Sequence, residues 1–259
     1  MIGSRAGRAL LAVVLATALV AGVLLVDPLR GPPAAPALDE SAPPGAVAAA
    51  ALEQAPARDH VVVTRLVGPA AAPPNRSAAL AEYQVDADDR QLRAVSRRYD
   101  DPYVTLENEH VTWQGWAGDL QFRGAGPGWR AAASRFDHVD RLRAARNVTR
   151  TGNESVVVVH VDDADAAYTL VEGRENVTDR LRAREEDYRA NLTVVVDRET
   201  DAPRRVVYRF ANSPDGNASR RRHTVLVYDY DWHDVDVRRP PGAGYTLVEF
   251  ASDLLNHRP

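Results

Sequence analysis

The sequence predicts an α+β protein: an antiparallel β-sheet packed on helices and preceded by one N-terminal transmembrane helix. Three observations predict this class. Residues 9–26 form an almost unbroken aliphatic run, residues 60–123 hold short β-rich segments separated by turn residues, and residues 191–236 hold three β-rich runs joined by two polar turns. Short strands that follow one another through tight turns pair antiparallel, which predicts the sheet.

Composition excludes several classes of protein. The chain has 259 residues, a net charge of −4 and 32 basic residues, all of them Arg. This acidic balance argues against a nucleic-acid partner, because proteins of that kind concentrate positive charge on one face. The chain contains no Cys, which excludes disulfides, Cys-based zinc sites, thiol catalysis and a Cys-linked lipid anchor.

The N-terminal aliphatic run is long enough to cross a membrane. At about 1.5 Å per residue, residues 9–26 span roughly 27 Å, close to the thickness of the hydrocarbon core. Arg5 and Arg8 precede the run and Asp27 follows it, so the positive-inside rule places the N-terminus in the cytoplasm. We therefore expect a single-pass protein of the cell membrane with an extracytoplasmic C-terminal domain. A cleaved signal peptide is the alternative, and it also places the domain outside.

Three regions follow from these boundaries. Residues 1–27 are the cytoplasmic tip and the anchor or uncleaved signal, residues 28–57 are a linker rich in Pro and Ala, and residues 58–259 are a β-rich extracytoplasmic domain. Pro-rich composition favours an extended spacer. An Ala-rich stretch at 44–54 predicts a short helix, which belongs either to the linker or to the start of the domain.

The first half of the domain is predicted to consist of short strands. Its β-branched and aromatic residues occur in segments bounded by Gly, Pro, Asp and Asn. The predicted strands are 60–67, 79–85, 91–99, 103–106, 110–116 and 120–123. The Gly-rich segment 124–128 that follows lacks the Lys-Ser/Thr pair of a phosphate-binding loop, so we expect it to be a turn that leads into a helix.

The clearest helix prediction is 129–146. Its apolar residues recur every three or four positions and therefore share one face; they are Trp129, Ala133, Phe136, Val139 and Leu142. We expect this helix to cover the apolar face of the sheet. Beyond it, 156–161 and 167–171 are predicted strands, and the charge-dense segment 174–189 is predicted to be a surface helix or an ordered loop.

Three more strands are predicted in the C-terminal region, at 192–196, 204–210 and 224–232. Side chains alternate along a strand, so one face of the last strand collects large apolar residues, namely Leu226, Tyr228, Tyr230 and Trp232. The apolar phase shifts after His233, which predicts a bulge or bend there. An apolar stripe at 247–255 predicts a final helix of about three turns.

These C-terminal elements resemble the LolA/LppX-like lipoprotein-carrier superfamily, and most closely its uncharacterised haloarchaeal membrane-anchored members, over about residues 58–241. The residues that carry the resemblance are Asp197, Glu199, Thr200 and Pro203 in one turn, and Val235, Asp236, Val237, Pro240 and Pro241 near the end. The resemblance implies a curved antiparallel sheet, a half-barrel wrapped on helices, whose better-known members hold acyl chains or other apolar ligands in the concave face. The chain lacks the lipobox Cys of these relatives, so the helix at 9–26 would replace the lipid anchor.

Six Asn-x-Ser/Thr sequons lie mostly in predicted turns, where an acceptor is exposed. The candidate glycosylation sites are Asn75, Asn147, Asn153, Asn176 and Asn217. Asn191 is a weaker candidate because it opens a predicted strand. The alternative is that all six are polar turn residues.

The candidate groove-facing residues are Tyr228, Tyr230, Trp232 and Phe136, which we expect on the covered face of the sheet. The other face of the last strand carries acidic residues that could bind a metal together with their neighbours; the candidates are Asp229, Asp231, His233, Asp234 and Asp236. A solvated sheet face is the preferred interpretation, because no second cluster has ligand spacing. The sequence has no HExxH motif and no Gly-x-Ser-x-Gly elbow.

We therefore predict a non-enzymatic, membrane-anchored extracytoplasmic domain without cofactor or metal, whose partners are the membrane and a lipid or other apolar ligand in a concave groove of the sheet. The alternative is a cell-surface module for protein or glycan interaction, with its groove filled by its own side chains. A cavity of about 300–1,000 Å³ between sheet and helices would favour the first, since ligand sites have this size. Close packing there would favour the second.

Overall fold

The structure is a computed structural model and describes residues 38–67, 78–97, 101–107, 112–116, 119–124, 133–136, 138–172, 187–213 and 222–237. The aliphatic run 9–26, the predicted final helix 247–255 and the sequons at Asn75, Asn176 and Asn217 lie outside these residues. Within the described ranges, no helix is long and apolar enough to cross a membrane.

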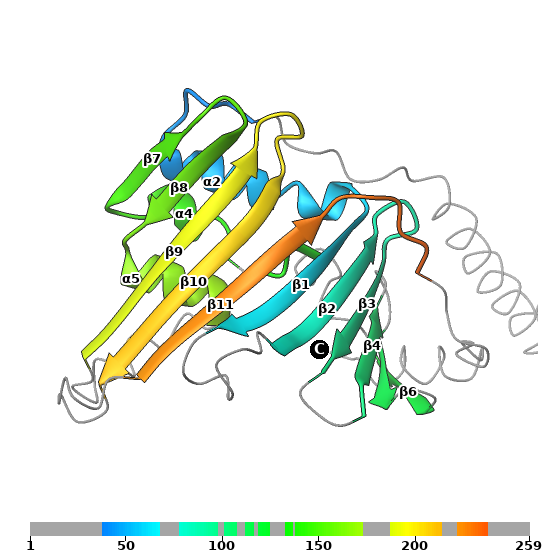
Figure 1. Cartoon of the computed structure of the whole chain (residues 1–259). Coiled ribbons are helices and arrows are strands. Elements are labelled where there is room, and N and C mark those ends of the chain that lie inside the picture. The colour runs from blue at the N-terminus through cyan, green and yellow to red at the C-terminus, as the bar shows by residue number, and fades with distance from the viewer. Residues whose placement is uncertain are drawn as a thin grey trace, which may run out of the picture.

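The described strands form one antiparallel sheet of eleven strands (Figure 1). Their bounds are β1 His60–Val67, β2 Ala78–Asp86, β3 Gln91–Ser96, β4 Tyr103–Glu107, β5 Thr112–Trp116, β6 Asp119–Gly124, β7 Val148–Gly152, β8 Val156–Val161, β9 Asp187–Asp197, β10 Pro203–Ser213 and β11 Arg222–Asp231. The spatial order is β6-β5-β4-β3-β2-β1-β11-β10-β9-β8-β7, so the described sheet ends in two edges and is not closed into a barrel. A large, open antiparallel sheet of this kind fits the curved sheet expected from the sequence.

Two meanders meet at the centre of the sheet. Strands β1 to β6 pair in chain order on one side, and β7 to β11 pair in chain order on the other. The two are joined where β1 pairs with β11, with Val62 opposite Tyr230 and Thr64 opposite Tyr228. This pairing brings together residues from the two ends of the described chain, while the other ladders are between neighbours in sequence.

Helices lie on one face of the half of the sheet formed by β7 to β11 (Figure 1). They are α2 Pro44–Leu52, α4 Arg141–Ala144 and α5 Ala164–Glu172, and a 3₁₀ turn, η2 Ala55–Ala57, follows α2. Helix α2 packs so closely on α4 that a Cβ atom at Gly45 would lie 2.0 Å from the carbonyl oxygen of Leu142. Any larger residue at Gly45 would therefore separate the two helices.

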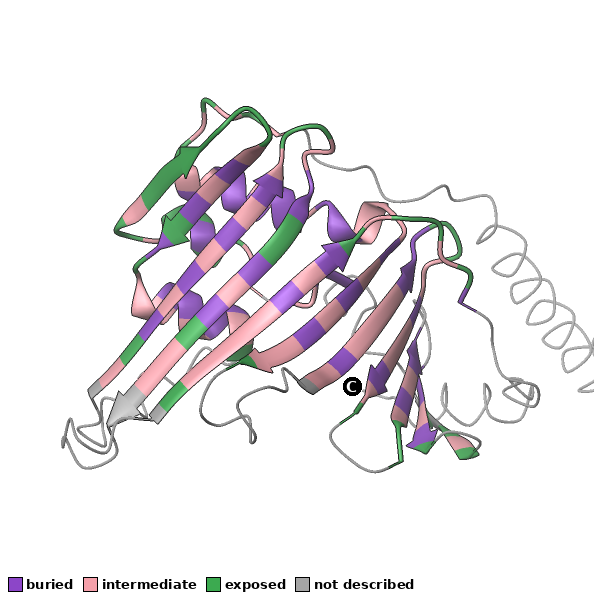
Figure 2. Cartoon of the chain, in the orientation of Figure 1, coloured by how far each residue is buried: buried purple, intermediate pink, exposed green. Residues whose placement is uncertain are grey.

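The main hydrophobic core fills the space between these helices and the sheet. Every second residue of the central strands is buried, which gives the banded pattern of Figure 2. Helix α2 contributes Ala48, Ala49, Ala51 and Leu52, all at 0% exposure. The Ala-rich stretch is thus a packed helix of the core. Its small side chains let the helix approach the sheet, and burying Leu52 contributes about 2 kcal/mol.

The helix predicted at 129–146 is interrupted in the part that the structure describes. Residues 133–134 and Arg141–Ala144 are helical. Between them, Arg135 and His138 adopt left-handed backbone angles with φ of 63° and 54°, which breaks the helix. Ser134 stabilises the break, since its hydroxyl donates to the carbonyl of Phe136 at 2.7 Å. Phe136 and Leu142 are nevertheless buried in the core as their apolar pattern predicted.

The strand predicted at 167–171 is also wrong, because this segment belongs to helix α5. Asp163 precedes the helix and its carboxylate accepts a hydrogen bond from the amide of Ala166 at 3.1 Å. An Asp cap followed by Ala-rich sequence favours helix over strand.

Strand β7, which pairs with β8 at the sheet edge, was not predicted. Its residues are mostly exposed and polar, so no apolar alternation marks it.

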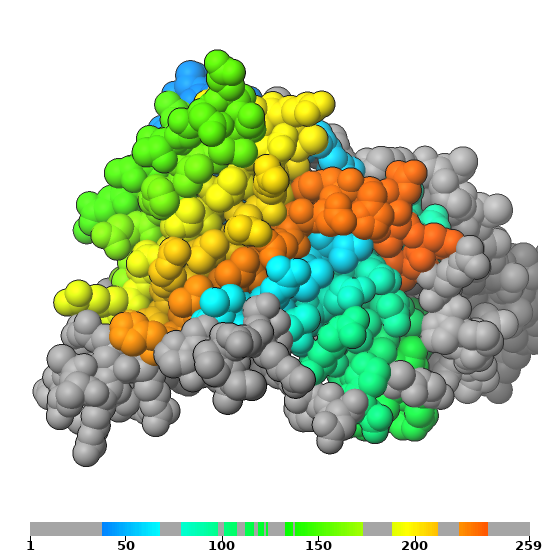
Figure 3. Space-filling model, in the orientation of Figure 1, coloured from blue at the N-terminus to red at the C-terminus, as the bar shows by residue number. Residues whose placement is uncertain are grey.

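Of the bulge or bend predicted near His233, the structure has the bend: the chain bends at His233, just after the strand ends. Strand β11 ends at Asp231, and the chain then crosses toward the other meander (Figures 1 and 3). Two buried or half-buried carboxylates hold this crossing segment: Asp59 accepts from the amide of Val235 at 3.0 Å, and Asp86 accepts from the amide of Val237 at 3.4 Å. The apolar phase shifts because Val235 and Val237 pack into a second cluster, beside Trp113.

Candidate functional site

The central strands present two faces with different chemistry. We call inner face the side covered by α2, α4 and α5; its side chains include Val159, Val194, Val206, Tyr228 and Thr64, which are cross-strand neighbours. We call outer face the opposite side, which carries none of the described helices; its side chains include His160, Thr193, Val207, Val227 and Arg65.

The candidate groove residues lie on or beside the inner face. Phe136, Tyr228 and Tyr230 are in the main core cluster, and Trp232 packs against it. Phe136 meets Tyr228 edge to face, with ring centroids 4.9 Å apart. The polar ends are satisfied inside the protein, because the hydroxyl of Tyr230 donates to the carbonyl of Ser134 at 3.1 Å and the indole of Trp232 donates to the carbonyl of Pro203 at 2.8 Å.

Part of the inner face is closely packed by the chain's own side chains. Under β8, β9 and β10 the residues with 0% exposure are Val157, Val159, Val161, Val194, Val196 and Val206. A side chain with no accessible surface has no water-sized void against it. A bound acyl chain would therefore have no room against these six residues.

Packing is less complete at the centre of the sheet. Leu66 and Leu226, which face each other across β1 and β11, are only half-buried, and Tyr83 on β2 is also half-buried. The guanidinium of Arg135 lies over the ring of Tyr83, 3.7 Å from its centroid. Described apolar side chains of the inner face therefore retain accessible surface here, as Phe210 does on β10.

A buried histidine on the inner face lies beside two of the candidate groove residues. His60 has 0% exposure, and its ring lies 4.7 Å from Trp232 and 5.8 Å from Tyr230. Its Nδ1 donates to the carbonyl of Arg58 at 2.9 Å. Desolvation lowers the pKa of His60 to about 4, so the ring is neutral at neutral pH.

The outer face contains an ion-pair network and a polar hollow. Asp229 accepts from Arg65 at 2.8 Å and from Arg205 at 2.5 Å, so this Asp is paired within the sheet. Asp231 is largely exposed and has His233 at 3.5 Å. Among the described residues, no three His, Asp or Glu side chains gather as they would around a metal ion.

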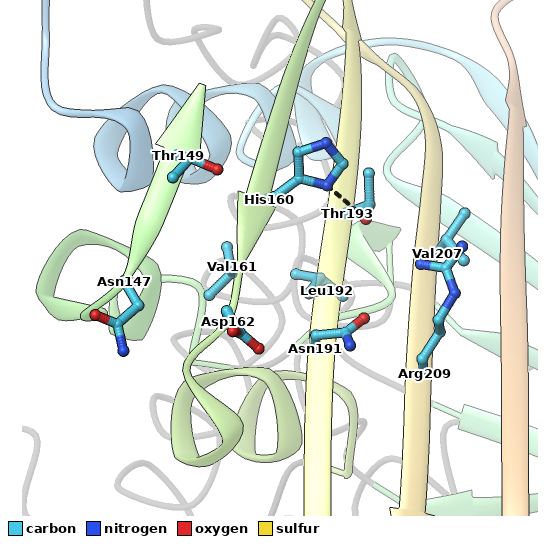
Figure 4. Close-up of a pocket in the computed structure, with 10 residues that line it drawn as sticks. All are labelled: Asn147, Thr149, His160, Val161, Asp162, Asn191, Leu192, Thr193, Val207 and Arg209. Atoms are coloured by element: carbon cyan, nitrogen blue, oxygen red, sulfur yellow. Dashed lines mark hydrogen bonds between the residues drawn. The ribbon is translucent and has the colours of Figure 1, made fainter. Parts of the chain in front are cut away.

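The hollow lies over β7 to β10 and has a volume of about 670 Å³ (Figure 4). It is lined by Asn147, Thr149, His160, Val161, Asp162, Asn191, Leu192, Thr193, Val207 and Arg209. Asn147 and Arg209 lie on opposite sides, and Asp162 and Asn191 lie between them (Figure 4). This size is within the range of small-molecule sites, about 300–1,000 Å³.

Most polar groups of the hollow are available for a ligand. His160 Nδ1 lies 3.1 Å from the hydroxyl of Thr193, which orients both. Within the described part of the chain, the side chains of Asn191, Asp162 and Arg209 have no hydrogen-bond or ion-pair partner. The site therefore offers a cation, a carboxylate and an amide that pair with no other described residue.

Two sequons meet at this hollow. Asn147 and Thr149 belong to one of them, and Asn191 and Thr193 to the other. Asn147 is exposed in a left-handed turn with φ of 51°, whereas Asn191 is half-buried within β9. Asn153 is exposed, and its side-chain oxygen Oδ1 accepts from the backbone amides of Ser155 and Val156. The sequence identified these Asn residues but did not predict that two of them share a site.

The hollow had no recognisable signal in the sequence. Its residues come from four strands, and their meeting depends on the pairing of β7 with β8 and of β8 with β9. Strand β7 was not predicted, so its partners could not be placed. The one available clue was that Asn191, Thr193, Val207 and Arg209 fall on the polar side of two predicted strands.

Comparisons with known proteins find similarity of structure only. The sequence matches no known protein family and no curated protein. One similar solved structure is the lipoprotein LppX of Mycobacterium tuberculosis, 10% identical, over 76% of this chain and 99% of that chain with a TM-score of 0.41. Another is LprF from Mycobacterium bovis, 12% identical, over 83% of this chain and 100% of that chain with a TM-score of 0.40.

Proposed function

We propose that this chain is a membrane-anchored, extracytoplasmic recognition module without catalytic activity, which meets a polar partner on the outer face of its sheet. One observation carries the proposal: the inner face under β8 to β10 is filled by the chain's own side chains, while the outer face holds an open polar hollow of about 670 Å³. This is the second of the two functions that the sequence left open.

The chemistry of the hollow supports binding rather than catalysis. Thr193 and His160 form a hydroxyl–imidazole pair, which could start a nucleophilic relay. A relay needs a third group on the far nitrogen of the imidazole, and His160 turns its ring away from Asp162 (Figure 4). The arrangement therefore orients polar groups for contact with a ligand and does not assemble a relay.

The anchor is proposed from the sequence. The run 9–26 is long enough to cross the hydrocarbon core, and Arg5 and Arg8 precede it. The described region starts at residue 38, so a short linker would join the anchor to the folded part. Such a tether would keep the hollow within a short distance of the membrane surface.

A lipid or other apolar ligand is the second candidate. The observation that favours it is the half-buried group of Leu66, Tyr83 and Leu226 on the inner face, with the charge of Arg135 beside it. An acyl chain would cover these apolar side chains, and Arg135 would meet an anionic head group. The site would be confined to the centre of the sheet, because the inner face under β8 to β10 is full.

One labelling experiment separates the two candidates. The full chain is placed in nanodiscs that contain a lipid with a photoactivatable diazirine in its acyl chain, irradiated, digested and mapped by mass spectrometry. The proposal predicts adducts on the peptide that contains residues 9–26 and none on peptides from β1, β2 or β11. Adducts near Leu66 or Leu226 would establish the apolar ligand instead. Absence of adducts in 9–26 would contradict the anchor.

A further inference from the structure

The polar groups of the outer hollow form a pattern that selects a class of ligand. Asn147 and Asn191 carry amides that both donate and accept, and Thr149 and Thr193 carry hydroxyls that do the same. A ligand that matches them must itself donate and accept at several neighbouring positions. Sugars have this property at every hydroxyl, whereas lipids and most metal ions do not.

The two charged side chains of the hollow narrow the class of ligand further. Arg209 has no ion-pair partner within the described residues, and its guanidinium lies along β10 beside Val207 (Figure 4). A guanidinium binds a carboxylate through two parallel hydrogen bonds. Asp162 lies nearer the other side, where it can accept hydrogen bonds from hydroxyls and would repel a second anionic group.

A phosphate group fits this arrangement less well. Phosphate sites gather several cations or backbone amides around one anion. Among the described lining residues the hollow has one Arg, and it has the carboxylate of Asp162 between Arg209 and Asn147 (Figure 4). The same carboxylate argues against a polyanion, because successive negative charges would have to pass it.

We propose that the outer hollow binds a carboxylated sugar of the uronic acid type, with its carboxylate on Arg209 and its hydroxyls on Asn191, Asp162 and Asn147. This inference rests on the proposed function and names the class of its partner. The lining residues include no Phe, Tyr or Trp ring on which a sugar could stack, so a single sugar would bind weakly and an oligosaccharide more tightly.

The test is a titration of the full chain in detergent micelles, made in a host without N-glycosylation so that Asn147 and Asn191 are bare. The probes are glucuronic acid, glucose and inorganic phosphate, followed by ligand-observed NMR. We expect glucuronic acid to bind at least tenfold more tightly than glucose, and we expect equimolar phosphate not to displace it. Absence of glucuronic acid binding, or its displacement by phosphate, would overturn the proposal.

Matched variants assign the binding to the hollow. Arg209→Gln removes the unpaired cation and should weaken glucuronic acid binding at least tenfold while leaving glucose binding unchanged. Arg204→Gln is the control, because Arg204 is an exposed residue of the same strand outside the hollow. An equal loss in both variants, or no loss in Arg209→Gln with an unchanged unfolding temperature, would contradict the assignment.

The two proposals can fail separately. If the titration fails while the lipid label stays on residues 9–26, the ligand class is wrong and the recognition module stands. If the label reaches β1 and β11, the proposed function is wrong whatever the titration shows.

Discussion

The two faces of β8, β9 and β10 are built from the same backbone but differ in packing. On the inner face, Leu192 and Val194 are 1% and 0% exposed and lie against helices. On the outer face, Asn191 and Thr193 are half-buried and line a hollow. Side chains alternate along a strand, so consecutive residues of the same strand lie on opposite faces of the sheet. The apolar face forms the buried core, and the polar face remains accessible to solvent.

The two faces should differ most in the unfolding free energy that is lost when a side chain is truncated to Ala. Leu192→Ala on the inner face should lower the free energy of unfolding by about 2–5 kcal/mol, because it opens a cavity among fully packed side chains. Thr193→Ala, one residue further on the outer face, removes the hydrogen bond to His160 and should lower it by about 1 kcal/mol. Urea unfolding of both variants measures the difference. Equal losses would show that the inner face is not the better packed of the two.

Acid should destabilise the folded chain, because His60 on the inner face is buried in its neutral form. Its pKa is about 4 in the folded chain and about 6.5 when unfolded. Between these values the unfolded state binds more protons, so stability falls as the pH falls from 6.5 to 4 and is fully present above 6.5. The loss should amount to about 3 kcal/mol for this group.

Substitution isolates the contribution of His60. His60→Phe keeps a ring beside Trp232 and Tyr230 and removes the titrating group. The slope of unfolding free energy between pH 6.5 and 4 should be smaller in the variant than in the parent chain. Thermal unfolding at a series of pH values measures it, with His160→Phe on the outer face as the matched control. A slope that is unchanged by His60→Phe would mean that this His is not protected from protons in the folded state.

The sequence predicted most of the sheet because its strands carry strong local signals. Val156–Val161 and His60–Val67 were found with the bounds that the structure has, since β-branched runs between turn residues have few alternatives. The buried side of β11 was also predicted, and Tyr228 and Tyr230 are in the core. Trp113 and Trp116 are three residues apart on β5 and therefore lie on opposite faces, at 4% and 46% exposure.

Features that depend on distant parts of the chain could not be predicted. The pairing of β1 with β11 joins segments far apart in sequence, and no local pattern specifies it. The helix expected at 129–146 is interrupted at Arg135 and His138, whose left-handed backbone has no marker such as Gly or Asn. The helical period correctly indicated that Phe136 and Leu142 are buried, but it did not indicate the shape of the backbone between them.

The candidate site could likewise be predicted only in part. Tyr228, Tyr230, Trp232 and Phe136 could be assigned to the inner face because their spacing is periodic. The hollow could not be predicted, because Asn147 and Arg209 are brought to the same hollow by the pairing of β7, β8, β9 and β10. Polar residues on an outer face follow no period that would distinguish a binding site from a solvated surface.

If the inner face under the helices is fully packed, a larger side chain placed there should destabilise the fold. Ala49 in α2 has 0% exposure, and Ala50 beside it is half-buried. Ala and Leu have similar helix propensities, so Ala49→Leu changes packing with little effect on the helix itself. In urea unfolding, we expect the free energy of unfolding to fall by about 1–3 kcal/mol for Ala49→Leu and to change little for Ala50→Leu. Unchanged or increased stability in Ala49→Leu would reveal room for a ligand beneath the sheet and would show that the inner face is not full.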